Sequence, residues 1–152
     1  MEQPTNTQKG ASKKTRFFDL ATIKRVPVAD LIGFRVTEAK AGRAVATFEA
    51  TSKHANPMGT LHGGILCDVA DAAMGMAFAS TLGEDETFTT VELKINFFRP
   101  VWNAKLTAEA QVIQRGKTIG YVECDIRDED KKLIAKTSST CLALNGTEGT
   151  GR

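Results

Sequence analysis

The segment at residues 63–82 constrains the fold of this chain more than any other part of the sequence. It is a run of about 20 residues dominated by Ala, Met and Leu and closed by Gly83, which predicts one long helix. Its side chains are small on almost every side, so the helix is thin and fits close against a surface that encloses it. We therefore expect a twisted antiparallel sheet wrapped around one buried helix. The small residues are Ala70, Ala72, Ala73, Gly75, Ala77 and Ala79.

Alternation of apolar and polar residues predicts about six strands in the rest of the chain. Two of them precede the helix and are joined by Ala41-Gly42 as a β-hairpin, and the others follow it as a run of consecutive antiparallel strands. Residues 17–32 predict a short helical region that Pro27 interrupts. Since one long helix and about six strands cannot alternate as βαβ units, the fold class is α+β. The predicted strands are residues 34–40, 43–49, 87–98, 105–115, 119–127 and 133–144.

The length of 152 residues fits one domain, which we place at residues 17–144 between flexible tails at 1–16 and 145–152. Lys and Arg exceed Asp and Glu by 20 − 18 = +2, which argues against nucleic acid as a partner. The longest mostly apolar stretch, residues 69–82, is too short to span a bilayer, and residues 1–16 lack the apolar core of a secretory signal. We expect a cytoplasmic protein that does not associate with membranes.

Three cysteines, Cys67, Cys124 and Cys141, are widely spaced and lie in apolar patterns. An odd number at such spacing favours reduced core residues over a disulfide framework. The chain has two histidines and no clustered carboxylates, so we predict no metal site, and His54 is expected on a loop surface. Neither a Walker nor a Rossmann glycine pattern occurs, and no cofactor is predicted.

Gly63 and Gly64 stand where a loop enters the long helix. Backbone N–H groups at that point have no partner within the helix and lie at the positive end of its dipole. Glycine also lets an acceptor approach the backbone closely. Two interpretations follow: a helix start that needs a flexible backbone, or a site that polarises a carbonyl oxygen during acyl transfer.

Asp71 lies in the apolar body of the helix, about two turns from its start, where capping effects fade. Asp68 is closer to that start and is expected to be exposed or capping. A carboxylate is charged at neutral pH, so Asp71 has either a structural role or a catalytic one as a nucleophile or general base.

The separation of Gly63 and Asp71 adds a geometric constraint. Eight residues of helix span about 12 Å, so one carbonyl group cannot easily contact both in a single chain. If both act on one carbonyl, a second protomer must supply one of them. A two-fold dimer with antiparallel helices meets this requirement and creates two equivalent sites.

The motif Asn-x-x-Gly-x-x-His-Gly-Gly at residues 56–64, with Asp71 eight residues after Gly63, resembles hotdog-fold acyl-CoA thioesterases. The resemblance is to the phenylacetate-degradation (PaaI-like) type, close to the 4-hydroxybenzoyl-CoA thioesterase group. The segment at residues 90–100, which ends in Phe-x-Arg-Pro, adds to it. It covers residues 33–144 and implies a hotdog fold, hydrolysis of acyl-CoA to free acid and CoA, and a homodimer or dimer of dimers without a cofactor.

The resemblance implies a role for each matching residue. Asp71 is the catalytic carboxylate, and the Gly63 N–H polarises the thioester carbonyl. His62 holds this loop and the thioester end, and Asn56 orients the water or the acyl thioester. Thr90 assists the water, although a register shift of one residue would put Thr89 in its place.

Residues Arg115-Gly116-Lys117 form a basic turn between two predicted strands. Its position resembles the turn over which this family lays the CoA nucleotide, where Arg115 and Lys117 would pair with phosphates and Gly116 and Gly64 would contact the ligand. A solvated hairpin tip is the alternative. Candidates for an apolar acyl pocket are Met58, Met74, Met76, Phe78 and Phe88.

Two other functions are alternatives to acyl-CoA hydrolysis. A non-catalytic module that binds or senses acyl-CoA is compatible with the fold, but such a module has little use for Asp71 inside an apolar helix. A hotdog dehydratase or hydratase places a catalytic histidine and a carboxylate in a different motif, which the Gly-Gly and Asp pattern does not match.

Overall fold

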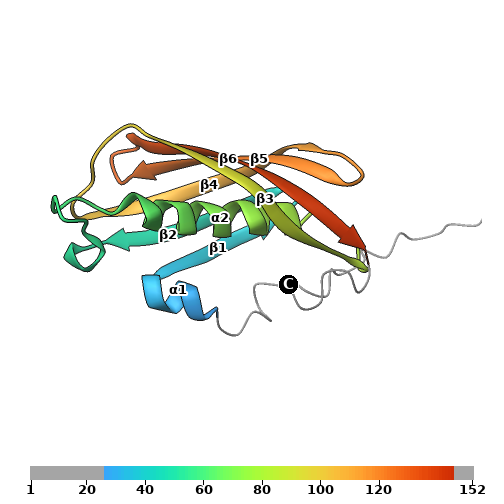
Figure 1. The fold of residues 1–152 in the computed structure, drawn as a ribbon, viewed down its shortest axis with the longest axis horizontal. Helices are drawn as coiled ribbons and strands as arrows, with labels where there is room; N and C mark the ends of the chain where they lie inside the picture. Colours follow the sequence, from blue (N-terminus) through green and yellow to red (C-terminus); the bar gives the residue numbers. More distant parts are fainter. Residues whose placement is uncertain (1–25, 146–152) are drawn as a thin grey trace, which may run out of the picture.

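A computed structural model describes residues 26–145 of the chain. These residues form a six-stranded antiparallel sheet that curves around the long helix α2 (Figure 1). The expected sheet wrapped around one helix is confirmed. The elements are α1 (Pro27–Ile32), β1 (Phe34–Lys40), β2 (Arg43–Ala50), the 3₁₀ helix η1 (Ser52–His54), α2 (Gly63–Ala79), β3 (Glu86–Phe97), β4 (Ala104–Arg115), β5 (Ile119–Asp128) and β6 (Leu133–Asn145).

Small side chains let α2 lie directly against the sheet. On the helix, Ala73 and Ala77 are fully buried, and α2 contacts strands β2 and β4 more than any other element. Those strands also direct alanines inward, among them Ala46 and Ala108, which are fully buried as well. Alanines on both layers leave little side-chain bulk at these positions, so the helix approaches the sheet closely there, as the composition of residues 63–82 predicts.

The strand order is β1-β2-β4-β5-β6-β3, in which β4, β5 and β6 are consecutive antiparallel neighbours as expected and β3 alone lies out of chain order. After α2 the chain enters β3, but β3 pairs with β6 and not with β4. The strand therefore lies at one edge of the sheet, with β1 at the other. Hydrophobic alternation shows which residues form a strand but not which strand lies beside it, since pairing depends on contacts distant in sequence.

The long helix ends earlier than predicted, at Ala79, with Ser80 as its C-cap. The Ser80 hydroxyl donates to the Ala77 carbonyl and the Thr81 hydroxyl to the Phe78 carbonyl, each at 2.7 Å. These two side chains satisfy carbonyl groups that a further helical turn would otherwise use. Gly83 is thus not the end of the helix.

The predicted helical region at residues 17–32 is corrected in part. Pro27 begins α1 instead of interrupting a helix, because a proline at the first helical position loses no hydrogen bond. Residues 17–25 and the two predicted tails, apart from Asn145, lie outside the described residues.

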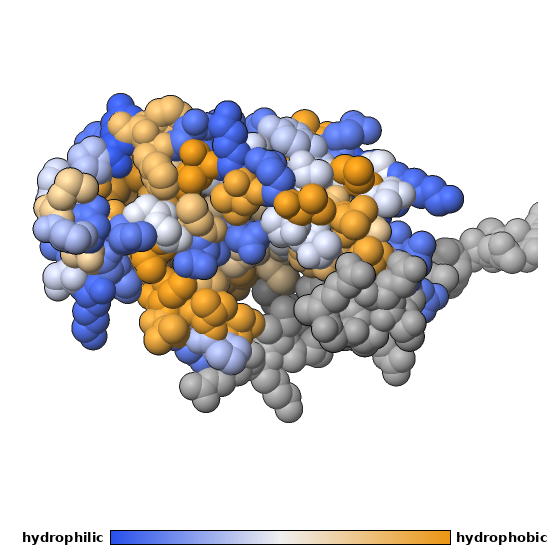
Figure 2. Space-filling model, viewed as in Figure 1, coloured by the Kyte–Doolittle hydropathy of each residue, from blue (hydrophilic) through white to orange (hydrophobic). Residues whose placement is uncertain are grey.

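None of the residues of α1 is buried, and Figure 2 shows apolar side chains gathered on this helix, where Val26, Val28 and Leu31 are exposed.

Two of the three cysteines, Cys124 and Cys141, are buried as expected, and all three are free. Cys67 is only half-buried, because it lies on a side of α2 that the sheet leaves partly open. Within residues 26–145 no helix is long and apolar enough to cross a membrane.

The close contact between α2 and the sheet predicts a strong penalty for a larger side chain. We expect Ala73→Leu to lower the free energy of unfolding by about 1–3 kcal/mol or more, because the added atoms must displace the facing strands. Urea denaturation measures this change. Ala72→Leu is the matched control on the half-buried side of the helix and should cost less than half as much. Equal losses would contradict the close packing described here.

Candidate active site

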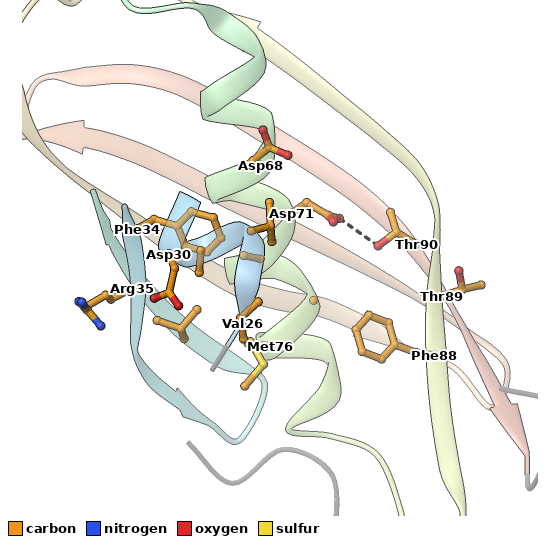
Figure 3. Close-up of a pocket in the computed structure, with 15 residues that line it drawn as sticks. Val26, Asp30, Phe34, Arg35, Asp68, Asp71, Met76, Phe88, Thr89 and Thr90 are labelled. Carbon is orange, nitrogen blue, oxygen red and sulfur yellow. Dashed lines mark hydrogen bonds between the residues drawn. The ribbon is translucent and has the colours of Figure 1, made fainter. Parts of the chain in front are cut away.

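Asp71 and Thr90 form a hydrogen-bonded pair between α2 and β3. The Thr90 hydroxyl donates to Oδ1 of Asp71 at 3.0 Å (Figure 3). Asp71 is exposed on the side of α2 that the sheet does not cover, and Thr90 is half-buried. Thr89 lies on the other side of the strand in the figure, so Thr90, and not its neighbour, is the threonine that meets the carboxylate.

An irregularity in β3 stands next to this pair. The pairing with β6 shifts register between Thr90 and Glu92, and the extra residue, Val91, is exposed. A bulge of this kind bends a strand and changes the direction of its side chains. It is located where β3 passes Asp71, and it also interrupts the alternation from which a register could be predicted.

A cavity of about 760 Å³ opens beside Asp71 and Thr90. It lies between α1 and β1 on one side and β3 on the other, with α2 as its base. Asp71 and Thr90 share the lining with four other polar residues, Asp30, Arg35, Asp68 and Thr89, and with nine apolar ones. This arrangement suits a substrate with an apolar group attached to a reacting polar one. The apolar residues of the lining are Val26, Val28, Ala29, Phe34, Val36, Ala72, Gly75, Met76 and Phe88.

The predicted acyl-pocket residues divide into two groups. Met76 and Phe88 line this cavity. Met74 and Phe78 are instead fully buried core residues, because they lie on the side of α2 that faces the sheet. Met58 is exposed in the loop before α2. The members of the two groups that belong to α2 differ in the face of the helix on which they lie. A segment that is apolar on all sides does not show from its sequence which face will be buried.

His62 is the N-cap of α2. Its Nδ1 accepts a hydrogen bond from the Gly64 N–H at 3.0 Å, and its carbonyl accepts one from the Ile65 N–H. No described residue accepts a hydrogen bond from the N–H of Gly63. The cap therefore satisfies the second and third N–H groups of the helix and leaves the first one available, at the positive end of the dipole.

Phe97 packs against Gly63. A Cβ atom at residue 63 would lie 2.8 Å from Cζ of Phe97, so a larger residue here would displace the ring. The two residues line a second cavity of about 370 Å³ together with Asn56, Arg99 and Pro100 of the two sequence motifs. This packing explains the first glycine of the pair, and contact with the His62 ring, 2.9 Å from a Cβ at residue 64, explains the second.

Asn56 holds the loop before α2. Its side-chain amide donates to the Thr60 hydroxyl at 2.9 Å, and its Oδ1 accepts from the N–H groups of Met58 and Thr60. These contacts form an Asx-type turn. Asn56 lines the same cavity as Gly63, but its polar atoms are engaged with the loop.

The described chain therefore places the predicted catalytic residues in two separate cavities. Asp71 and Thr90 line one, and Gly63 and Asn56 line the other. The eight residues of α2 between Gly63 and Asp71 keep them about 12 Å apart. One chain contains both halves of the predicted site but does not bring them together.

The two basic residues of the predicted CoA-binding turn differ: Arg115 is bound to other protein groups, and Lys117 is exposed. Arg115 pairs with Glu86 at 3.3 Å and donates hydrogen bonds to the carbonyls of Gly116 and Lys117. Lys117 and Gly116 are exposed. Arg115 is thus attached to the protein, while Lys117 extends from the turn.

His54 is a structural residue that the sequence analysis placed wrongly on the loop surface. Its Nδ1 accepts from the Thr51 N–H at 3.1 Å, so Nε2 carries the hydrogen that is donated to the Ile32 carbonyl at 3.0 Å. Its ring also packs edge-on against Phe48. The spacing of Thr51 and His54, three residues apart as in a capping box, was the available signal.

The thiols of the described residues are poor nucleophiles. Partial burial, together with the charges of Asp68 and Asp71, raises the pKa of Cys67. Burial raises the pKa of Cys124 to about 12 and also raises that of Cys141. Because the thiolate is the reactive form, the Asp71 carboxylate is a better candidate than any of these thiols. Residues 26–145 contain no group of three or more His, Cys, Asp or Glu that could hold a metal ion.

Comparison with known proteins identifies the family. The model of the thioesterase superfamily matches residues 58–135. The 1,4-dihydroxy-2-naphthoyl-CoA hydrolase of Listeria monocytogenes is 31% identical over 111 residues, which cover 73% of this chain and 90% of that protein. Acyl-coenzyme A thioesterase 13 of Mus musculus is 26% identical over 120 residues, which cover 76% of this chain and 85% of that protein.

Solved structures agree with this result. The PaaI protein of E. coli matches with a TM-score of 0.76 and 28% identity, over 83% of this chain and 90% of that one. A thioesterase of Haemophilus influenzae matches with a TM-score of 0.79 and 26% identity, over 91% and 97%. This chain belongs to the thioesterase superfamily. The expected hotdog fold, the PaaI-like resemblance and the assignment as a thioester hydrolase are confirmed.

The capping role of His62 predicts an effect on stability. We expect His62→Ala to lower the free energy of unfolding by about 0.5–2 kcal/mol, because the Gly64 N–H loses its acceptor. His62→Asn is the matched control, since asparagine is a good N-cap, and it should recover most of the loss. Chemical denaturation measures both variants. If the two variants lose the same amount of stability, His62 does not act as a cap.

Proposed function

We propose that this protein hydrolyses acyl-CoA thioesters with an apolar acyl group to the free acid and CoA. The observation that supports this proposal is the Asp71–Thr90 pair in the wall of a partly apolar cavity, in a chain of the thioesterase superfamily. An aryl or fatty acyl group fits the apolar part of the lining, and the thioester then reaches the carboxylate. The names of the Listeria monocytogenes and Mus musculus relatives agree with CoA thioesters as substrates.

The complete site requires a dimer in this proposal. The separate positions of Asp71 and Gly63 support it, because one thioester cannot reach both in the same chain. β3 lies at an edge of the sheet and pairs with β6 alone among the described strands, which leaves its other side open to a second copy of β3. A two-fold axis beside β3 would bring Gly63 of one protomer opposite Asp71 of the other and create two equivalent sites.

The reaction then proceeds in two stages at the thioester carbon. The Asp71 carboxylate either attacks this carbon directly or removes a proton from a water molecule that attacks it. The carbonyl oxygen becomes an oxyanion that accepts a hydrogen bond from the Gly63 N–H. The C–S bond then breaks. By the water route the proton held by Asp71 passes to the CoA sulfur, and by the direct route CoA leaves as a thiolate that takes a proton from solvent. By the direct route, water afterwards cleaves the acyl–Asp71 anhydride.

The other predicted residues have supporting roles in this scheme. Thr90 fixes the orientation of the Asp71 carboxylate through Oδ1, so that Oδ2 is available for the reaction. His62 engages Gly64 and so leaves the Gly63 N–H as the single donor toward the substrate. Asn56 keeps the loop next to Gly63 in place. The exposed Lys117 at the turn after β4 meets the phosphates of CoA.

Replacing the carboxylate tests the chemical step. We expect Asp71→Asn to lower kcat at least about 100-fold with a small effect on substrate binding, because the amide is neither a base nor a nucleophile. Release of free thiol from a panel of acyl-CoA substrates measures the rate. Asp68→Asn, one turn earlier on the same helix, is the matched control and should retain most of the activity. A purified Asp71→Asn enzyme with more than a tenth of wild-type turnover would exclude the catalytic role.

The shared site can be tested at Gly63. Gly63→Pro removes the N–H at the first helical position, where proline is tolerated, and should lower kcat about 100- to 1,000-fold. Gly63→Ala keeps the N–H and adds the same contact with Phe97, so it controls for packing. Mixed dimers of Gly63→Pro and Asp71→Asn chains should regain activity, since one of the two sites has both groups intact. Demonstrated mixed dimers without activity would contradict a site formed by two chains.

A further inference from the structure

A row of three side chains in contact runs from the turn after β4 to the cavity beside Asp71. It consists of Arg115, Phe78 and Phe88, and we name it the aromatic row. The guanidinium of Arg115 lies over the Phe78 ring, 5.0 Å from its centroid. The Phe78 and Phe88 rings meet edge to face, with centroids 5.6 Å apart and an interplanar angle of 63°. Phe78 is fully buried, so its ring moves only if a group packed against it moves or is removed.

Two glycines provide the space for this row. A Cβ at Gly120 of β5 would overlap the Phe78 ring, and a Cβ at Gly75 of α2 would lie 3.2 Å from Cζ of Phe88. Each ring therefore lies directly on backbone. A ring held on one side by backbone and on another by a second ring moves only if its neighbours move with it.

Arg115 fixes the end of the row that lies outside the cavity. Its guanidinium pairs with Glu86 of β3 at 3.3 Å, and the side chain is 21% exposed. Its Nε is buried without a partner among the described residues, which is consistent with a side chain packed for contact with Phe78. Lys117, two residues later, is exposed. The two basic residues of one turn therefore have different environments.

The other end of the row is a wall of the cavity. Phe88 and Gly75 both line it, together with Asp71 and Thr90. Gly75 follows Asp71 by four residues on the same face of α2, about 6 Å further along the helix. Figure 3 shows the Phe88 ring projecting from β3 toward α2. An acyl group whose carbonyl is at Asp71 and which extends along α2 meets Phe88 after about this distance.

From these contacts we infer that Arg115 is a positioning residue for the acyl end of the site: through Phe78 it holds Phe88 as the wall that limits acyl length. This inference rests on the proposed thioesterase function. It gives Arg115 a role different from the phosphate contact predicted from sequence, and it leaves Lys117 as the basic residue of the turn that is available to CoA. The site is then selective for short or single-ring acyl groups over long chains.

The test compares acyl length with and without the nucleotide. The butanoyl and decanoyl thioesters of CoA and of N-acetylcysteamine, which lacks the nucleotide, are hydrolysed by wild type, Arg115→Ala and Lys117→Ala. We expect Arg115→Ala to raise the decanoyl-to-butanoyl ratio of kcat/KM about five-fold or more on both thiol carriers, because the wall is released. Lys117→Ala, the matched control, should raise KM for the CoA esters and leave the ratio unchanged.

Two further variants cover loss of folding and separate the possible results. Phe88→Leu should shift the ratio in the same direction as Arg115→Ala, and Arg115→Lys, which keeps a cation over Phe78, should shift it less. If Arg115→Ala does not fold, the ratios measured for Phe88→Leu and Arg115→Lys test the inference in its place. A KM increase limited to the CoA esters and equal for both acyl lengths would make Arg115 a phosphate ligand and overturn the inference, as would an unchanged ratio in Phe88→Leu. A wild-type protein inactive on all four thioesters would instead refute the proposed function.

Discussion

The close contact of α2 with strands β2 and β4 is the constraint on which the rest of the structure depends. Fully buried alanines lie on both layers, with Ala73 and Ala77 on the helix and Ala46 and Ala108 on the strands. Because the helix lies so close, the sheet curves around it, and its edge strands β1 and β3 reach either side of the remaining helix face. The cavity lies between these edges, and Asp71 projects from the helix into it.

Glycine beneath an aromatic ring recurs wherever the site is formed. Phe97 lies on Gly63, Phe88 lies on Gly75, and Phe78 in turn lies on Gly120. In each case the absent Cβ lets a ring reach the backbone. The first contact is beside the N–H proposed to bind the oxyanion, and the second is in the wall proposed to meet the acyl group. The same packing device thus operates at both ends of the proposed substrate.

The boundaries of the strands were well predicted from the sequence. The neighbours of each strand and the contacts of individual side chains were not. The boundaries of β1 were correct, and those of the other strands differ by one residue, because alternation is a property of each segment alone. The position of β3 beside β6 was missed, since nothing within a strand names its neighbour. The contact of Arg115 with Glu86 was not predicted either, because the two residues are 29 positions apart in the sequence. His54 was misplaced because both of its ring nitrogens are used, one of them across 22 residues.

The sequence by itself determined the α+β class, the thin central helix and the motif that marks Gly63 and Asp71, since small-residue content, periodicity and spacing are local. It also determined that these two residues are about 12 Å apart, because helix geometry follows from residue count. Only the tertiary structure decided that Thr90 and not Thr89 meets Asp71, and that Arg115 faces Phe78. The first depends on where β3 passes the helix, which a bulge and the pairing with β6 set, and the second depends on the packing of β4 against α2.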